Sequence, residues 1–148
     1  MSGAQATSIL LVEDNPDDVE LTRIAMLDAG LSADLSVVAD GMEALHFLRQ
    51  EDPWGHADRP DMILLDLNLP QLDGRELLKI IKADAALCSI PVVVLTTSVD
   101  RNDVQAAYES HANSFISKPA DFDQYVRALQ SLRDFWFQAA ELPQNGRR

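Results

Sequence analysis

The chain has 148 residues, of which 47% are hydrophobic and 24% charged, and its formal net charge is −12. This composition predicts one globular domain and argues against disorder over most of the length. So acidic a chain is a poor candidate for wrapping a nucleic-acid backbone or binding an anionic membrane, because both need a basic surface. No apolar run approaches the roughly 18 residues that span a bilayer, and residues 1–7 lack the features of a signal peptide. The single cysteine, Cys88, permits no internal disulfide, which fits a cytoplasmic protein.

Five short apolar runs predict β-strands at residues 8–12, 35–39, 62–65, 91–95 and 114–116. Each run is followed by a longer segment whose apolar residues recur at helical spacing, beginning with a helix over about residues 17–29. Strands and helices that alternate five times predict an α/β fold, a doubly wound parallel sheet with helices on both faces. The run at 35–39 alternates apolar and polar residues more than the others, so we expect it at an edge of the sheet.

Chemically active side chains follow four of the predicted strands. Glu13 and Asp14 come after the first strand, Asp66 after the third, Thr96 after the fourth and Lys118 after the fifth. Ligand sites of open α/β sheets lie beyond the carboxyl ends of the strands, so we expect these residues to meet at one edge. Asp66 is the sharpest case, because a carboxylate at the end of a buried strand is costly without a cation or hydrogen-bond donors.

Clustered carboxylates without cysteine or histidine ligands favour a hard cation, and Mg²⁺ prefers carboxylates, waters and a phosphoryl oxygen. An aspartate neutralised by a metal can act as a nucleophile toward phosphorus. A lysine and a hydroxyl can then hold the other phosphoryl oxygens. The residue types at this edge therefore indicate phosphoryl transfer to a carboxylate.

These motifs, taken together and in order, resemble the response-regulator receiver domain of two-component systems over about residues 8–135. The matching pieces are Val12-Glu13-Asp14-Asn15, Leu64-Leu65-Asp66-Leu67-Asn68-Leu69-Pro70, Asp73-Gly74, Leu95-Thr96 and Lys118-Pro119. The resemblance implies a flavodoxin-like sheet of five parallel strands in the order 2-1-3-4-5. It also implies transfer of a phosphoryl group from a phosphohistidine on a sensor histidine kinase to a strand-end aspartate.

Carried over to this sequence, the resemblance implies that Asp66 is the phospho-acceptor. Asp14 would bind Mg²⁺ directly, Glu13 would act through a water molecule, and the backbone carbonyl of Asn68 would complete the metal sphere. Glu13 stands where the family often has aspartate, which leaves the metal site plausible.

The resemblance also implies roles for three residues on the last two strands. Thr96 would donate a hydrogen bond to the phosphoryl group and Lys118, followed by a cis bond to Pro119, would pair with it. Phe115 would be the aromatic switch residue that turns inward as Thr96 moves. Taken singly, each has a plainer reading: a β-forming threonine, a solvated lysine and a core phenylalanine. Likewise, Glu13 and Asp14 alone read as acids at a helix start.

The last residues of the chain bear on two questions: how the protein passes on its signal, and whether it forms a dimer. We divide the chain into a tail at residues 1–7, a receiver domain at 8–135, and the end of the last helix with an extension at 136–148. The last part has no room for an output domain, so we expect the output to be another protein or the receiver itself. Phe135, Trp136 and Phe137 point about 100° apart on a helix, so they cannot all face one core, and we expect a homodimer through the last helix and the extension. A looser resemblance links the chain to stand-alone regulators paired with bacterial phytochrome kinases. It rests on Leu95-Thr96-Thr97-Ser98, Ala112-Asn113-Ser114-Phe115, and the ending with Phe135-Trp136 and Leu142-Pro143.

A different class of function, an aspartyl-phosphate phosphatase, is the alternative. Such enzymes need a second acid two residues after the nucleophile, and here that position holds Asn68, which cannot act as a general acid. We therefore expect no enzyme activity beyond self-phosphorylation from a phosphodonor and slow self-dephosphorylation. A nucleotide-binding fold is disfavoured because the first strand leads into Glu-Asp-Asn-Pro rather than a glycine loop.

Overall fold

The computed structural model describes residues 7–51, 55, 59–67, 69, 72–96, 105, 114–117 and 122–135. Its elements in chain order are β1 (Thr7–Val12), α1 (Pro16–Asp28), β2 (Ala33–Val38), α2 (Gly41–Leu48), β3 (Met62–Leu65), α3 (Gly74–Ala83), β4 (Val92–Thr96), β5 (Ser114–Ser117) and α5 (Phe122–Arg133). The segment in which the sequence predicts a fourth helix, between β4 and β5, lies outside the described residues apart from Gln105. No helix in the described part of the chain is both long and apolar enough to cross a membrane.

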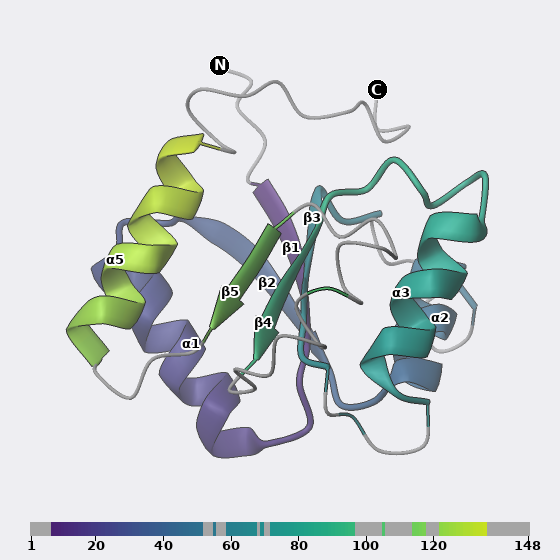
Figure 1. Cartoon of the computed structure of the whole chain (residues 1–148), viewed down its shortest axis with the longest axis horizontal. Coiled ribbons are helices and arrows are strands. Elements are labelled where there is room, and N and C mark those ends of the chain that lie inside the picture. The colour runs from purple at the N-terminus through teal and green to yellow at the C-terminus, as the bar shows by residue number, and fades with distance from the viewer. Residues whose placement is uncertain are drawn as a thin grey trace.

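The strands form one parallel sheet in the order β2-β1-β3-β4-β5 (Figure 1). This is the order that the family resemblance implies, and β2 lies at an edge as its alternating pattern indicates. Because β1 and β3 are neighbours near the middle of the sheet, the residues that directly follow them are brought side by side.

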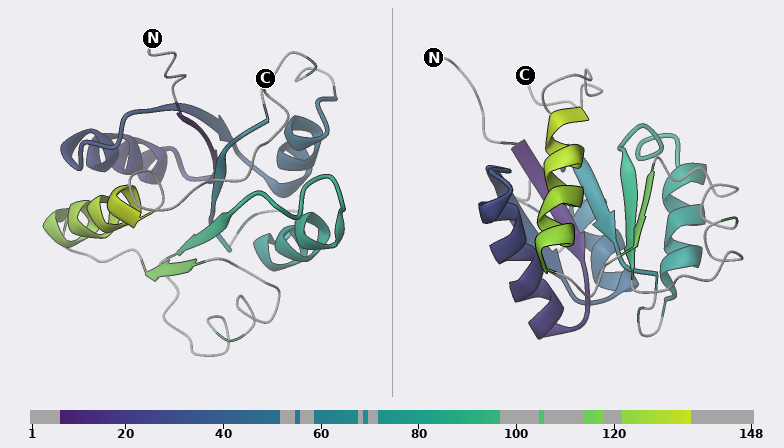
Figure 2. Two further views of the ribbon diagram at one scale, coloured as in Figure 1. Left: turned by 90° about the horizontal axis from the view of Figure 1, so that it is seen from above. Right: turned by 60° about the vertical axis from the view of Figure 1, so that its left-hand side comes forward.

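Helices cover both faces of the sheet: α1 and α5 pack on one face, and α2 and α3 on the other (Figure 2). Each central strand contributes to two cores, since successive side chains point to opposite faces. In β1, Ile9 and Leu11 join the core beneath α1 and α5, whereas Leu10 and Val12 join the core beneath α2 and α3. A strand covered on both sides has no polar face, which is why β1, β3 and β4 are apolar almost throughout.

Three helices begin with a capping side chain. The side chain of Asn15 accepts hydrogen bonds from the backbone N–H groups of Asp17 and Asp18, at 2.9 and 3.3 Å. Asp40 and Asp73 cap α2 and α3 in the same way. Side-chain oxygens at these positions satisfy N–H groups that have no partner within the helix. The caps fix where α1, α2 and α3 start, close behind the carboxyl ends of the preceding strands.

Polar contacts at two places join α5 to α1, in addition to the apolar packing of these helices in one core. The hydroxyl groups of Thr22 and Tyr125 lie 2.7 Å apart, and both side chains are buried. At the other end of the pair, Arg133 Nη1 donates to the carbonyl of Ala29, where α1 ends, at 2.6 Å. Gly30, at φ 73°, reverses the chain there in a conformation that favours glycine. The last turn of α5 is therefore anchored beside the last turn of α1.

Six predicted strand boundaries differ from the structure by one or two residues, and the starts of β2 and β4 have a clear physical reason. Strand β2 begins at Ala33 rather than residue 35, because Ala33 and Asp34 pair with Thr7 and Ser8 of β1. Strand β4 begins after Pro91, which has no N–H to give to a ladder; its carbonyl accepts from the N–H of Ile63 at 2.9 Å. In both places backbone pairing, rather than the side-chain pattern, sets the boundary.

Candidate functional site

Three acidic residues meet at the carboxyl edge of the sheet. Glu13, Asp14 and Asp66 each place a carboxylate oxygen within 4.8 Å of the others. Glu13 and Asp66 are 2% and 8% exposed, whereas Asp14 is exposed. The convergence follows from the topology, because Val12 and Leu65 are partners in the β1–β3 ladder and the acids directly follow them. The sequence-based expectation that these acids lie together is confirmed.

The backbone of the sheet holds the two buried acids. The N–H of Asp66 donates to the carbonyl of Val12 at 3.1 Å, and the N–H of Glu13 donates to the carbonyl of Val38 at 3.0 Å. Both acids thus extend the hydrogen-bonding pattern of their strands by one residue. Their positions are set by the rigid centre of the fold rather than by a loop.

The start of α3 packs directly against the backbone of the Asp66 loop. The N–H of Gly74 donates to the carbonyl of Leu67 at 3.0 Å. A Cβ at Gly74 would lie 2.7 Å from Cα of Leu67 and still closer to the carbonyl oxygen of Asp66. Only glycine fits this approach without a shift of the loop. Asp73-Gly74 is one of the motifs in the sequence, but no local pattern indicates the contact of Gly74 with Asp66.

This donor set suits a hard divalent cation. All three side chains offer carboxylate oxygens, the ligands that Mg²⁺, Mn²⁺ and Ca²⁺ share, and no soft sulfur or imidazole ligand accompanies them in the described cluster. Two buried carboxylates beside a third acid are unfavourable by themselves, and a cation relieves that repulsion. The residues present therefore fit a divalent metal site.

Of the other predicted site residues, Thr96 and Phe115 are placed by their backbones. Thr96 is the last residue of β4, the neighbour of β3, and pairs with Ser117 of β5. It therefore stands at the same edge of the sheet as Asp66. Phe115 lies within β5, opposite Val94. Asn68 and Lys118 lie outside the described residues, so their contributions stay predictions.

The burial of Glu13 is a feature that sequence reasoning missed. The two acids after β1 look equivalent in sequence, yet Glu13 faces the interior and Asp14 faces solvent. Alternation along a strand would have been the signal: Glu13 still follows the extended path of β1, so neighbouring side chains point in opposite directions. Asn15 N–H donates weakly to Glu13 Oε2, at 3.4 Å, which ties the start of α1 to this acid.

Comparison with known proteins agrees with this geometry. Residues 9–130 match the family described as the response regulator receiver domain. Response regulator Rcp1 of Synechocystis sp. is 41% identical over 135 residues, which cover 91% of this chain and 92% of that protein.

Solved structures show the same likeness. The phosphorylated cyanobacterial phytochrome response regulator RcpA superposes with a TM-score of 0.88 at 44% identity, covering 95% of this chain and all of that one. The Mn²⁺-bound form of Rcp1 gives a TM-score of 0.85 at 40% identity, covering 93% of this chain and 99% of that one. The family model matches residues 9–130, and the three acids lie together at the carboxyl edge of the sheet. The chain therefore belongs to the response regulator receiver domain family and is a response regulator of the two-component type.

Proposed function

We propose that this response regulator accepts a phosphoryl group on Asp66 from the phosphohistidine of a sensor histidine kinase, at a site where Glu13, Asp14 and Asp66 hold Mg²⁺. The observation that carries the proposal is the convergence of the three carboxylates within 4.8 Å at the carboxyl edge of the sheet. The phosphorylated form then changes which proteins the regulator binds.

The chemistry assigns a distinct task to each acid. An oxygen of Asp66 attacks phosphorus, the bond from phosphorus to the histidine nitrogen of the donor breaks, and Asp66 becomes an acyl phosphate. Asp14 is exposed and Glu13 is buried. With Mg²⁺ bound, Asp14 would be a direct metal ligand and Glu13 would act through a water molecule. A bound Mg²⁺ supplies positive charge that offsets the carboxylates and the incoming phosphoryl oxygens.

Residues on the neighbouring strands complete the proposed site. Thr96 donates its hydroxyl to a phosphoryl oxygen, and Lys118 pairs with another, which stabilises the charge that moves onto the aspartate. The backbone carbonyl of Asn68 is the remaining protein ligand of the metal. Phe115 on β5 changes position with Thr96 and carries the signal away from the site.

The names of the relatives support the finer parts of this proposal. One neighbour is described as a cyanobacterial phytochrome response regulator in its phosphorylated form, and another was solved with Mn²⁺. A third, RPA3017, takes part in red light signalling of R. palustris and superposes with a TM-score of 0.88 at 33% identity. We therefore propose a phytochrome-type histidine kinase as the phosphodonor of this chain.

Intact-mass measurement after incubation with acetyl phosphate and Mg²⁺ tests the acceptor. Wild-type protein should gain one phosphoryl group, and Asp66→Asn should gain none. The matched control is Asp34→Asn, which removes an exposed acid on the edge strand β2 and should be phosphorylated like the wild type. Chelation of the metal should abolish the gain. Phosphorylation of Asp66→Asn at the wild-type rate would contradict the proposal.

We propose no phosphatase activity beyond slow loss of the regulator's own phosphate. Asn68 follows Asp66 by two residues and Ser98 follows Thr96 by two, and neither side chain is a strong base that would activate an attacking water. The decay of phosphorylated protein, followed by mass or by phosphate release after removal of the donor, measures this. A lifetime of the phosphorylated protein of only seconds would contradict this proposal.

A homodimer through the last helix and the C-terminal extension is a second proposal, carried by the exposure of Phe135. This ring is 57% exposed at the end of α5, where a large apolar side chain suits an interface. Sedimentation at micromolar concentration, with and without a phosphate mimic, should show dimers, and Phe135→Ser should weaken them. Monomer alone in both states would refute the proposal.

A further inference from the structure

The start of α2 packs closely against the chain that follows Asp66. A Cβ on Gly41, the first residue of α2, would lie 2.6 Å from the carbonyl oxygen of Leu72 and 2.9 Å from its Cβ. Leu72 directly precedes Asp73, the residue that caps α3. The chain from Asp66 to Asp73, here called the Asp66 loop, is therefore in contact with α2 as well as with α3.

The backbone of α2 does not itself require glycine at this position. Among the glycines in the described part of the chain, only Gly30 has a positive φ, so the backbone conformation of Gly41 is open to residues with a side chain. Glycine is also a poorer helix former than alanine. The close approach of Leu72, which leaves no space for a side chain, is the feature that explains a glycine here.

Apolar packing seats the Asp66 loop on one face of the sheet. Leu67 and Leu69 are buried there, and Leu72 packs against the same core. Buried side chains of α2 and α3 complete this core, since both helices cover that face (Figure 2). A displacement of Leu72 therefore disturbs the packing of the loop on both helices.

Two glycines hold the Asp66 loop near its two ends. Gly41 meets the end of the loop at Leu72, and Gly74 meets its beginning at the backbone of Asp66 and Leu67. Each glycine directly follows a capping aspartate, whose side chain accepts a hydrogen bond from the backbone of its helix at 2.7 Å. The caps fix where both helices start, so crowding at either glycine displaces the loop.

We propose that Gly41 is a positioning residue for phosphoryl transfer to Asp66, because it leaves the space in which α2 holds the Asp66 loop in place. The inference rests on the proposed function, which makes Asp66 the phospho-acceptor. Gly41 acts through Leu72, which leads directly into Asp73 and Gly74. Gly74 in turn contacts the backbone carbonyl of Asp66, so a shift at Leu72 is passed to the acceptor.

The size of the effect follows from the crowding at Leu72. With a Cβ at Gly41, the carbonyl oxygen of Leu72 would have to retreat by about 0.8 Å to reach about 3.4 Å, where ordinary van der Waals contact begins. A misplacement of about 1 Å in a reacting group can cost about 100-fold in rate. Part of the retreat is absorbed before it reaches Asp66, so we expect Gly41→Ala to slow phosphorylation about tenfold.

Phosphorylation by acetyl phosphate, followed by intact mass over a range of Mg²⁺ concentrations, tests the proposal. Misplacement of Asp66 lowers the maximal rate at saturating Mg²⁺. A loss of stability alone instead raises the Mg²⁺ concentration that gives the half-maximal rate, and leaves the maximal rate unchanged because bound metal restores the folded state. For Gly41→Ala we expect a maximal rate about tenfold below that of the wild type.

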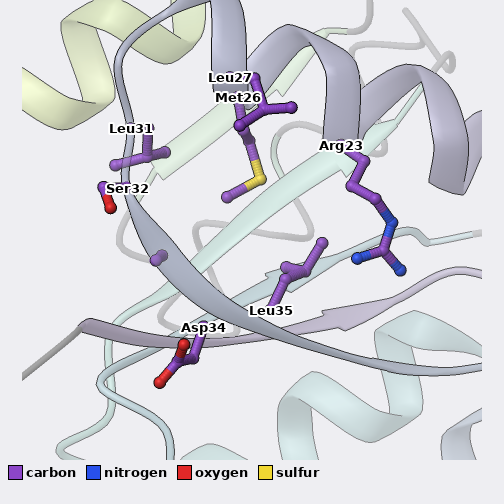
Figure 3. Close-up of a pocket in the computed structure, with 8 residues that line it drawn as sticks. Arg23, Met26, Leu27, Leu31, Ser32, Asp34 and Leu35 are labelled. Carbon is purple, nitrogen blue, oxygen red and sulfur yellow. The ribbon is translucent and has the colours of Figure 1, made fainter.

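The matched control is Leu35→Ala, on the other face of the sheet. Leu35 extends from β2 toward α1 in a groove that Met26 and Leu27 also line (Figure 3), and it packs against the core beneath α1 and α5. Its truncation lowers stability without touching the Asp66 loop. The maximal rate of this variant should therefore stay within about twofold of that of the wild type.

Leu72→Ala keeps the proposal testable if Gly41→Ala does not fold. It introduces no clash with Gly41 and loosens the loop from α2, so it should lower the maximal rate about threefold or more. If Gly41→Ala folds, a maximal rate within about twofold of the wild type overturns the proposal; if it does not, the same result for Leu72→Ala does so. An equal loss in Leu35→Ala would overturn it too. A wild type that gains no phosphoryl group would instead contradict the proposed function.

Discussion

Replacing Asp66 with asparagine should stabilise the fold when no metal is bound. The substitution keeps the shape of the side chain and removes one of three carboxylates that lie within 4.8 Å of one another. Two of the three, Glu13 and Asp66, are buried, where repulsion between charges is weakly screened. Asparagine therefore relieves a strain that the wild-type protein carries in the absence of a cation.

The size of the effect follows from Coulomb's law. Two unit charges 4.8 Å apart repel each other by about 3.5 kcal/mol at an effective dielectric constant of 20. Hydrogen bonds to the carboxylates offset part of this repulsion, and solvent screens the exposed Asp14. We therefore expect Asp66→Asn to raise the free energy of unfolding by about 1–3 kcal/mol at neutral pH and low salt.

Urea unfolding followed by circular dichroism, first in EDTA and then in Mg²⁺, measures the effect. At 100 times the dissociation constant, Mg²⁺ should stabilise the wild type by about 2.7 kcal/mol and the variant by less. The difference in unfolding free energy between the two proteins should therefore be smaller in Mg²⁺ than in EDTA. The control Asp34→Asn removes an exposed acid far from the cluster and should change stability by at most about 0.5 kcal/mol. If Asp66→Asn proves no more stable than the wild type in EDTA, the repulsion argument fails.

Three further outcomes are expected. Gly74→Ala forces a Cβ to 2.7 Å from Cα of Leu67, so it should cost about 1–3 kcal/mol in stability and slow phosphorylation by acetyl phosphate; unchanged kinetics would show that the loop moves without consequence. Tyr125→Phe leaves the buried hydroxyl of Thr22 without its partner at 2.7 Å and should cost about 1–3 kcal/mol in urea unfolding, whereas the double variant with Thr22→Val should recover part of that loss. Burial lowers the pKa of Lys82 from its ordinary value of 10.5. Between the lowered pKa and 10.5, the unfolded chain binds more protons than the folded chain. The free energy of unfolding of the wild type should therefore rise with pH, relative to that of Lys82→Met, across that interval. A loss of stability relative to Lys82→Met over the same interval would contradict that sign.

The acidic site was accessible from sequence because its signal is local. Each acid directly follows an apolar run, and the carboxyl ends of parallel strands share an edge. Once the order β2-β1-β3 is given, Glu13, Asp14 and Asp66 must meet. The family resemblance supplied that order, since periodicity alone does not say which strands are neighbours.

The different environments of Glu13 and Asp14 could not be read from their residue types. Both are acids in the same short turn, yet one is 2% exposed and the other is exposed. The direction of the strand decides which of them faces the interior. The approach of Gly74 to the backbone of Asp66 is equally invisible in sequence, because it depends on how α3 packs against the end of β3.

By itself, the sequence determined the alternation of strands and helices, the two-sided burial of the central strands and the identity of the acids, because each depends on residues close together in the chain. Only the tertiary structure decided how α5 meets α1. Arg133 and Ala29 are 104 residues apart, and their contact fixes the last turn of α5 beside the end of α1. Such a contact depends on packing two helices on the same face of the sheet, and no local pattern records that distance.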